Sequence, residues 1–348
     1  MQKLQYGGAY PLSREESQRI NVVKFIAIVL VISVHAYDVD LEGTAGLGPV
    51  LAFEDLFASI LGRSTMPVFF FCSSILLFKN LRTYADVLKT KARTVMLPYF
   101  LWNSFWIAVF IAFQTLPFTA AMFSGDSVPI LNRDLWGWLN LYGIGAFEPQ
   151  DYPLWYMRDL ILIIFLSPLL WKLVDRFPRA TLLGVLISIP IARTDIVLVM
   201  GLQYTLLGAY VVKKNIHVDA VDRFPMVWAL ILYAAAVAFV YVVRLDVLKR
   251  TLQLFGVFFW IRVSAGIVGR SRERILKGAQ SLFMIYVAHE LTLTCFKKLY
   301  FKFVPHTPLV VLVSYFLVPA LVIALCILAD KLTKRFTPRF HALITGGR

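Results

Sequence analysis

The first apolar stretch of the chain carries polar side chains whose types and spacing suit acid–base chemistry. A run rich in Ile, Val, Ala and Phe also contains Asn21, Lys24, His35 and Asp38. At 100° per residue, His35 returns to within about 20° of Lys24 on a helix, and the other two lie about 60° to either side. Because imidazole accepts a proton near neutral pH, this stripe predicts a general base at His35, with Asp38 holding one ring nitrogen.

A structural interpretation competes with the catalytic one. A lysine near the end of a membrane helix can extend its ammonium group to the interface, and a histidine can hydrogen-bond a neighbouring helix. Each of these structural explanations accounts for a single residue, Lys24 or His35, taken alone. The shared face of Asn21, Lys24 and His35 favours a functional site.

Two further polar sets interrupt apolar stretches later in the chain. The first opens the segment 154–174 and contains Trp155, Tyr156, Arg158 and Asp159. The second lies in the segment 280–301 and contains Tyr286, His289 and Glu290, which an i, i+3, i+4 spacing puts on neighbouring faces of a helix. Pairing of His289 and Glu290 with another helix explains them as well as a role in a site does.

The composition decides which class of protein these stretches belong to. Of 348 residues, 59% are hydrophobic and 16% are charged, and the mean hydropathy is +0.71, whereas soluble proteins average about 45–50% apolar and 25% charged residues. These values predict a polytopic membrane protein. The net charge of +14 is therefore interpreted as loop charge that sets membrane orientation, and not as nucleic-acid binding. Three cysteines in apolar runs fit no metal-binding spacing, so no metal site is expected.

Ten apolar segments approach or exceed the length of about 17–25 residues that a helix needs to cross a bilayer. They are 20–38, 50–79, 94–116, 154–174, 180–192, 196–212, 226–243, 250–269, 280–301 and 308–330. Two are weaker: 180–192 is short and contains Pro190, and 50–79 contains Gly62 and Pro67, where a kink or a break is expected. We expect an all-α protein of about ten transmembrane helices.

Charge in the connections predicts the orientation. With the N-terminus inside, the cytosolic connections hold 23 Lys and Arg and the outer ones eight, which predicts that both termini are cytosolic. Two outer connections, 244–250 and 297–302, are more basic than this rule predicts. We divide the chain into a cytosolic lead-in (1–19), an integral membrane domain (20–332) and a basic cytosolic tail (333–348).

The polar sets and their surroundings resemble the acyltransferase 3 family, whose members are multi-pass membrane enzymes that acylate extracytoplasmic carbohydrate. The resemblance rests on five motifs in order: NVVKFIAIVLVISVH, MPVFFFCSSILLF, RTVMLPYFLW, PLWYMRDLILIIFLSPLL and SLFMIYVAHE. No single motif is specific, but their order extends from about Asn21 to Asp330. The resemblance implies an acyltransferase, acting on groups other than amino-acyl groups, in the plasma (inner) membrane of a bacterium.

The chain departs from the family pattern at two places. Asn21-x-x-Lys24 stands where members usually have Asp-x-x-Arg, and Ser73-Ser74 stands where they usually have Ser-Gly. Lysine keeps the positive charge but lacks the planar fork that binds a phosphate or carboxylate through two hydrogen bonds. These departures leave the role of His35 as predicted and the donor contacts open.

The resemblance also implies the substrates. The donor is expected to be acyl-coenzyme A, with acetyl-CoA favoured, and no cofactor is expected to be bound. Lys24, Arg93 and the basic loop 270–277 would hold the donor's phosphates from the cytosolic side. The acceptor would be a carbohydrate, either a lipid-linked sugar or a surface polysaccharide. Further contacts with substrate are assigned to Asn21, Ser73, Tyr286 and Glu290.

In the mechanism that the resemblance implies, His35 deprotonates a sugar hydroxyl or itself accepts the acyl group. Asp38 or Asp159 would orient the imidazole. The oxyanion would be stabilised by one of three candidate donors: Arg158, Tyr286 or His289. Trp155 and Tyr156 would border the acceptor sugar, although packing explains these aromatic residues equally well.

Two other functions compete with this one. A polytopic transporter or flippase for a lipid-linked or polymeric glycan would also bury charges, along a translocation path. Such proteins often consist of two related halves, and the sequence shows no such symmetry. An acyltransferase-like scaffold without activity is the third interpretation, and Asn21 and Lys24 are its only indications.

Overall fold

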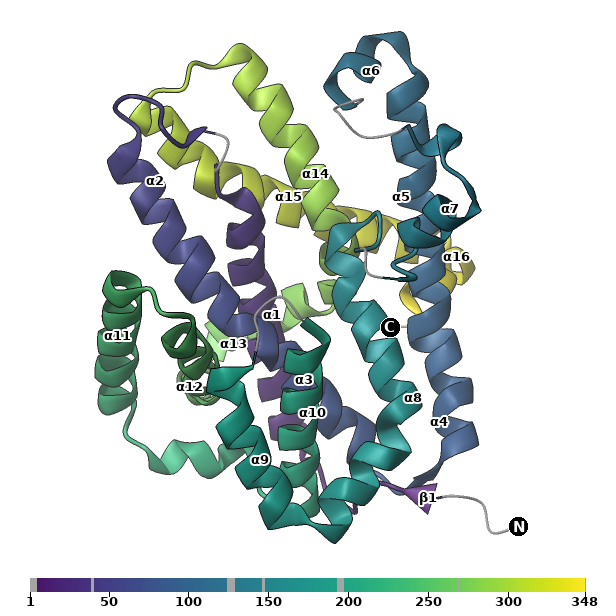
Figure 1. Ribbon diagram of the computed structural model, residues 1–348, viewed down its shortest axis with the longest axis vertical. Coiled ribbons are helices and arrows are strands. Elements are labelled where there is room, and N and C mark those ends of the chain that lie inside the picture. The colour runs from purple at the N-terminus through teal and green to yellow at the C-terminus, as the bar shows by residue number, and fades with distance from the viewer. Residues whose placement is uncertain are drawn as a thin grey trace.

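The computed structural model describes residues 5–38, 41–123, 129–145, 148–192, 197–267 and 269–347, and most of them are helical (Figure 1). The α-helices are α1 (Arg14–Ala36), α2 (Gly48–Asp55), α3 (Arg63–Phe78), α4 (Tyr84–Lys91), α5 (Leu97–Thr115), α6 (Pro117–Phe123), α7 (Leu135–Leu141), α8 (Trp155–Arg176), α9 (Pro178–Ile191), α10 (Val197–Lys213), α11 (Met226–Val243), α12 (Asp246–Gly266), α13 (Gly269–Ala279), α14 (Leu282–Phe303), α15 (Pro308–Phe336) and α16 (Pro338–Thr345). Two π-helical segments, η2 (Leu56–Gly62) and η3 (Ala92–Met96), and three 3-10 turns, η4 (Ile130–Asn132), η5 (Tyr152–Leu154) and η6 (Val218–Arg223), complete the helical elements. Strands β1 (Gln5–Tyr6) and β2 (Arg82–Thr83) form one short antiparallel pair.

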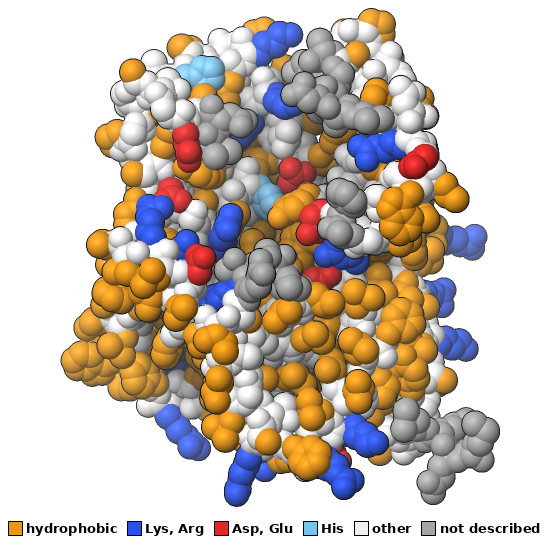
Figure 2. Space-filling view, in the orientation of Figure 1, with side chains coloured by type: hydrophobic (Ala, Val, Ile, Leu, Met, Phe, Trp, Pro, Cys, Tyr) orange, Lys and Arg blue, Asp and Glu red, His pale blue; other side chains and the backbone are white. Residues whose placement is uncertain are grey.

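The all-α prediction is confirmed, and a helix covers each of the ten apolar segments within the described ranges. Five helical segments of the described chain are long and apolar enough to cross a membrane: Arg14–Ala36, Gly48–Phe78, Tyr84–Thr115, Met226–Val243 and Pro308–Phe336. α11 exposes large apolar side chains around much of its surface, as expected of a helix in contact with lipid. In Figure 2, apolar side chains cover most of the lower half of the molecule and charged ones border it. The chain is a helical, multi-pass membrane protein.

The segment predicted at 50–79 is one continuous helical run and not two pieces. Its irregularity is the π-helical segment η2, which ends at Gly62. A Cβ at Gly62 would lie 2.5 Å from Val34 Cγ2 and 2.7 Å from the Leu30 carbonyl oxygen. Glycine at this position lets α3 lie directly against α1.

Pro67 is accommodated inside α3 by a partner from another helix. Because proline has no N–H, it leaves the carbonyl of Arg63, four residues earlier, without its usual intrahelical donor. Gln253 of α12 donates its Nε2–H to that carbonyl at 3.3 Å. The contact fixes α12 beside the start of α3, where Arg63 lies.

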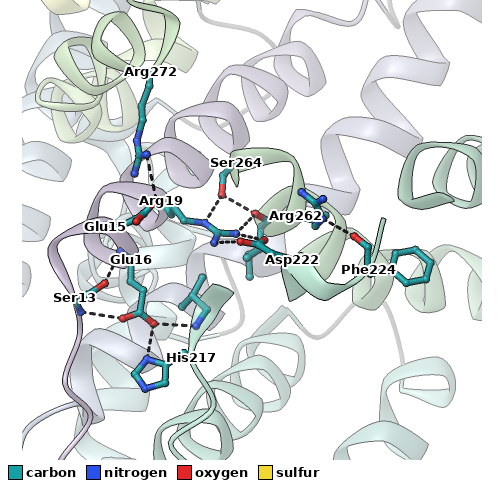
Figure 3. A network of polar contacts seen from close by, with 12 residues as sticks. Ser13, Glu15, Glu16, Arg19, His217, Asp222, Phe224, Arg262, Ser264 and Arg272 are labelled. Atoms are coloured by element: carbon teal, nitrogen blue, oxygen red, sulfur yellow. Dashed lines mark hydrogen bonds and ion pairs between the residues drawn. The ribbon is translucent and has the colours of Figure 1, made fainter. Parts of the chain in front are cut away.

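The N-terminal part of α1 is clamped by a buried arginine (Figure 3). Arg19 is 3% exposed and donates to both carboxylate oxygens of Asp222, at 2.7 and 2.8 Å. Its Nε–H donates to the hydroxyl of Ser264 at 3.3 Å. These bonds join α1 to η6 and α12 and so fix its rotation about its own axis.

A second set of contacts stabilises the N-terminus of α1. Ser13 and Glu16 form a capping box, in which each side chain accepts from the backbone N–H of the other. The Glu16 carboxylate also lies 3.1 Å from Nδ1 of His217. On the other side, Arg272 of α13 pairs with Glu15 at 3.5 Å, as Figure 3 also shows.

α1 lies in the middle of the molecule, between α3, α12, α13, α14 and α15. α10 packs against α3 and α8 on the next layer. The tail predicted from residue 333 is helical: α15 continues to Phe336, and α16 packs on α5, where the Trp102 indole donates to the Ile344 carbonyl at 2.9 Å. Residues 1–4 of the lead-in and 348 of the tail lie outside the described residues.

Candidate active site

A cavity of about 520 Å³ runs along the polar face of α1. α1 lines this first cavity with five residues at helical spacing: Asn21, Lys24, Ile28, Val31 and His35. The stripe predicted from the sequence is therefore one wall of a cavity. α1 presents this face because the Arg19 clamp holds its opposite face against η6 and α12.

Three other helices complete the first cavity. α3 contributes Met66, Phe69 and Ser73, α8 contributes Trp155, Tyr156 and Leu160, and α14 contributes Phe283, Tyr286 and His289. Lys91 and Thr94 line it near the α4–α5 junction, together with Gln280 in the connection before α14. The cavity thus has cationic side chains toward the N-terminal end of α1 and histidines toward its C-terminal end.

His35 and His289 contact one another inside the first cavity. Their rings are 5.3 Å apart between centroids and meet edge to face at 66°. His289 is fully buried, whereas His35 retains partial exposure. Tyr152, in the turn before α8, lies on another side of His35 with its ring centroid 6.0 Å away.

The hydrogen bonds of His289 fix its tautomer. Nδ1 lies 3.0 Å from the Ile285 carbonyl and 2.9 Å from the Tyr286 carbonyl, both on its own helix. Since carbonyls only accept, Nδ1 carries the proton and Nε2 carries a lone pair. Nε2 is buried and has no hydrogen-bond partner among the described residues. Neutral His289 therefore offers the site an acceptor and not a donor.

Three tyrosine and serine hydroxyls shape the wall opposite α1. Ser73 and Tyr156 bond through their hydroxyls at 2.7 Å. Tyr286 donates its hydroxyl to the Pro153 carbonyl at 2.6 Å, which ties α14 to the turn before α8. These bonds join α3, α8 and α14 around the cavity.

A second cavity, of about 300 Å³, meets the first at His35. His35, Met66 and Trp155 line both cavities. α1, α3 and α8 contribute to both cavities, and the second is lined mainly by other residues of η2, α3, α10 and α12. His35 therefore lies where two separate spaces converge.

The family model of the acyltransferase 3 family, described as an acyltransferase domain, matches residues 17–330. The chain belongs to the acyltransferase 3 family. It is therefore an acyltransferase. The chain is 30% identical over 354 residues to the succinoglycan biosynthesis protein ExoH of Rhizobium meliloti (strain 1021), with 95% of this chain and 92% of that protein aligned. No solved structure matches the chain.

The acyltransferase 3 resemblance is thus confirmed. One departure from its usual motif has a structural explanation. Ser74, where members usually have glycine, donates its hydroxyl to the Thr205 carbonyl of α10 at 2.6 Å. The glycine stands on the other helix: a Cβ at Gly208 would lie 2.7 Å from the Ser74 Cβ. α3 and α10 can therefore pack closely, because the glycine that allows the contact lies on α10 and not on α3.

In this acyltransferase, the predicted pairing of Asp38 with His35 is not what the structure shows. α1 ends at Ala36, so the helical position assumed for Asp38 is wrong. The Asp38 carboxylate instead pairs with Lys297 of α14 at 2.5 Å, and its backbone N–H donates to Glu54 at 3.1 Å. Lys297 belongs to the segment 297–302, which is more basic than the orientation rule predicts. Its pairing with Asp38 explains why it is buried.

Arg158 and Asp159 line neither cavity. Tyr156, Met157 and Leu160 line the first cavity from α8, whereas Arg158 and Asp159 lie on another part of the helix surface. Arg158 bonds Asp159 at 2.9 Å and Glu148 at 3.3 Å. Their predicted roles beside His35 do not fit this placement.

Two carboxylates in the connection before α8 have raised pKa values. Burial raises the pKa of Glu148, although the Arg158 charge opposes this effect. Burial, with the Glu290 carboxylate nearby, raises the pKa of Asp151 well above its usual range. Glu290 lies outside both cavities and accepts from the Thr294 hydroxyl at 3.4 Å.

Arg93 also lies away from the first cavity. It lines a separate small cavity with Arg339, beside α16. The π-helical segment η3, which contains Arg93, changes the register of side chains relative to an α-helix. Lys91 and Thr94 reach the first cavity in its place.

Sequence reasoning missed the position of Tyr152 and assigned the donor's phosphates to Arg93 and not to Lys91. Tyr152 lies in a 3-10 turn, where no helical period marks it. Lys91 was visible as a basic residue before the third apolar segment, but its face could not be known without the π-helical segment. Within the described ranges, no three His, Cys, Asp or Glu side chains gather as a metal site.

Proposed function

We propose that this acyltransferase moves an acetyl group from cytosolic acetyl-CoA to a hydroxyl of an extracytoplasmic or lipid-linked carbohydrate, with His35 as the general base. The observation that carries the proposal is the position of His35 at the meeting point of two cavities. A base that serves a donor from one side and an acceptor from the other belongs at such a point. The name of the relative, a succinoglycan biosynthesis protein, supports a polysaccharide acceptor.

The proposal includes a topology of ten membrane-crossing helices, with both termini on the cytosolic side of the bacterial plasma membrane. The excess of Lys and Arg in the connections assigned to the cytosol supports this orientation. It puts the N-terminal end of α1, with Lys24 and Lys91, near the cytosol. The second cavity then opens toward the outside.

The donor would lie along α1. Its phosphates would be held by Lys24 and Lys91, whose ammonium groups act as point charges toward phosphate. Its flexible arm would follow Ile28 and Val31, which offer an apolar wall between the cations and His35. The thioester would then reach His35 and the Ser73–Tyr156 hydroxyl pair.

The transfer step balances within the site. The hydroxyl oxygen of the sugar attacks the thioester carbon while His35 takes the hydroxyl proton, and the carbon–sulfur bond breaks. Protonated His35 then gives that proton to the departing coenzyme A thiolate, so that an ester and free coenzyme A result. If His35 is acylated first, the same atoms move in two steps.

The developing oxyanion needs a hydrogen-bond donor. Neutral His289 is unsuited because its only N–H donates to α14 carbonyls, and the Tyr286 hydroxyl is committed to Pro153. Ser73 and Tyr156 line the same cavity, and when Tyr156 donates to Ser73 the hydroxyl hydrogen of Ser73 remains for the oxyanion. We assign oxyanion stabilisation to this pair.

The test compares surface glycans and transfer activity. Membranes that contain the wild-type protein, supplied with labelled acetyl-CoA and unacylated glycan, should label the glycan, and His35→Ala membranes should not. His306→Ala, which changes an exposed histidine, is the matched control and should retain transfer. Labelling that persists in His35→Ala would contradict the role of the base. Glycan export that depends on the protein without any change in acylation would favour the transporter.

A further inference from the structure

The transfer step leaves one buried lone pair of the first cavity unused. It belongs to Nε2 of His289, which lines the cavity, is buried and has no hydrogen-bond partner among the described residues. A buried polar atom without a partner costs free energy, and native proteins keep few of them. The lone pair therefore indicates a second state of the site, in which a hydrogen-bond donor reaches it.

The position of this lone pair is fixed. The Nδ1–H of His289 donates to two carbonyls of its own helix, which holds the ring. Contacts with other segments hold α14 at the same level. The Trp106 indole of α5 donates to the Val287 carbonyl at 3.0 Å, and the Tyr286 hydroxyl donates to Pro153. A donor must therefore come to His289, because the His289 ring is not free to turn toward a donor.

His35 needs an acceptor of this kind. A general base must keep one ring nitrogen protonated and held, so that the other nitrogen presents its lone pair to the hydroxyl. Neither carboxylate that the sequence assigned to this task performs it, because Asp38 pairs with Lys297 and Asp159 pairs with Arg158. A neutral acceptor can hold the N–H equally well.

His289 lies within reach of His35. α1 packs against α14, and the ring centroids of the two histidines are 5.3 Å apart. Imidazole nitrogens lie about 1.1 Å from the ring centroid, so one nitrogen of each ring can come within about 3 Å of the other, which is a hydrogen-bond distance. The χ2 torsion of histidine is broad, so the His35 ring can turn at low cost.

We propose that His289 is a positioning residue for the transfer reaction, in which its Nε2 accepts a hydrogen bond from one ring N–H of His35 and leaves the other ring nitrogen of His35 free as the base. The inference rests on the proposed function, in which His35 is that base. His289 then has the task that a carboxylate has in a Ser-His-Asp triad. As a neutral group, it adds no negative charge to a site within the membrane domain, where buried charge is costly.

The proton stays on His35 throughout this arrangement. When the sugar hydroxyl attacks the thioester carbon, its proton goes to the free nitrogen of His35, and the other N–H of the imidazolium keeps its bond to His289. A hydrogen bond from a charged donor is stronger than one from a neutral donor, so His289 stabilises the imidazolium as it forms. The proton then passes to the coenzyme A thiolate as the carbon–sulfur bond breaks, and His35 returns to its neutral state.

The experiment compares two amide side chains at position 289, in the full-length protein in lipid nanodiscs. His289→Gln places an amide about as far from the backbone as Nε2, where its carbonyl oxygen can accept from His35. His289→Asn is one carbon shorter, and its amide reaches only as far as Nδ1. Both variants replace the ring by a neutral amide, so a merely structural role predicts the same effect for both. Thermal unfolding reports whether each variant folds, and transfer is measured with acetyl-CoA and unacylated glycan.

A second measurement follows the His35 ring without any reaction. The chain has five histidines, so labelling histidine with nitrogen-15 gives few ring signals. Comparison with His35→Ala assigns the signals of His35. Their chemical shifts report which ring nitrogen carries the proton, and so whether one tautomer is held.

We expect His289→Asn to lower kcat about a hundredfold with the KM for acetyl-CoA unchanged, because positioning of the base is lost and donor binding is not. His289→Gln should keep most of the wild-type kcat. The His35 ring should show one tautomer in the wild-type protein and in His289→Gln, and a mixture of both tautomers in His289→Asn.

Equal kcat values for folded His289→Asn and His289→Gln would overturn the inference. If either variant fails to fold, the wild-type protein decides, because a wild-type His35 ring that populates both tautomers would also overturn it. A raised KM for acetyl-CoA in His289→Asn, with kcat unchanged, would do the same, since the lone pair would then bind the donor. A single wild-type tautomer that is lost in His289→Asn, without any acetyl transfer by the wild-type protein, would refute the proposed function and still support the histidine pair.

Discussion

The imidazole rings of His35 and His289 meet edge to face, 5.3 Å apart between centroids, although one closes the first helix and the other lies on α14. The bonds from Nδ1 to α14 carbonyls hold the His289 ring still. Its position therefore restricts the orientation of His35. Through this contact, the first and the last of the five sequence motifs contribute to the same site.

Replacing His289 tests how much of its role is packing. His289→Phe keeps a ring of similar size against His35 but removes the Nε2 lone pair. We expect kcat to fall about a hundredfold, at the lower end of acid–base contributions, with the KM for acetyl-CoA unchanged. Steady-state kinetics in nanodiscs provide the measurement. Wild-type kcat in His289→Phe would mean that only the shape of the ring matters.

The two cations of the first cavity should act on donor affinity. Lys24→Ala and Lys91→Ala each remove a phosphate partner, so the KM for acetyl-CoA should rise about tenfold with kcat little changed. Lys89→Ala, on the same helix as Lys91 but exposed and outside the cavity, is the control. If Lys24→Ala and Lys91→Ala have the same KM for acetyl-CoA as Lys89→Ala, the two lysines do not bind the donor.

The pair of Asp38 and Lys297 should support the fold and not the chemistry. Lys297→Met leaves a buried carboxylate without its cation, which costs about 3–5 kcal/mol of folding free energy. The double change Asp38→Asn with Lys297→Met should recover much of that loss and retain transfer. Thermal unfolding and transfer assays measure the two effects. A double variant that is stable but inactive would instead support the predicted role of Asp38 in orienting His35.

Asp151 should make stability depend on pH. Burial and the Glu290 carboxylate raise its pKa, so the folded protein keeps a proton that the unfolded chain releases near pH 4. Stability is fully present below the unfolded pKa and falls as pH rises through the raised one. The Tm in detergent should therefore decrease from about pH 4 upward, and less so in Asp151→Asn. Asp134→Asn, on the same outer connection, should follow the wild-type curve; a parallel shift of both variants would refute the assignment.

Gly62 should be required for the contact of α1 with α3. Gly62→Ala would put a Cβ 2.5 Å from Val34 Cγ2, so the helices must separate at the level of His35. We expect lower thermal stability and strongly reduced transfer. Gly184→Ala on α9, where a Cβ meets nothing within 4 Å, should leave transfer intact and slightly raise stability. Normal activity in Gly62→Ala would show that the close contact is dispensable.

The sequence by itself determined the class of protein, the positions of the helices and one wall of the site. Apolar runs of bilayer length can hardly be anything but helices, and a helical period of 3.6 residues puts Asn21, Lys24 and His35 on one face without reference to any other part of the chain. The same local rule placed His289 and Tyr286 on α14, and both line the cavity.

The tertiary structure alone decided what faces that wall. Asp38 follows the end of α1 and meets Lys297, Arg93 is turned away by a π-helical segment, and Arg158 points behind α8. These outcomes depend on helix ends, register shifts and contacts between distant helices. Local periodicity carries no information about them, because each is settled by which partner another helix brings within hydrogen-bond distance. The second cavity, where Arg63 of α3 and Arg250 of α12 meet beside His35, exists only once the helices are packed.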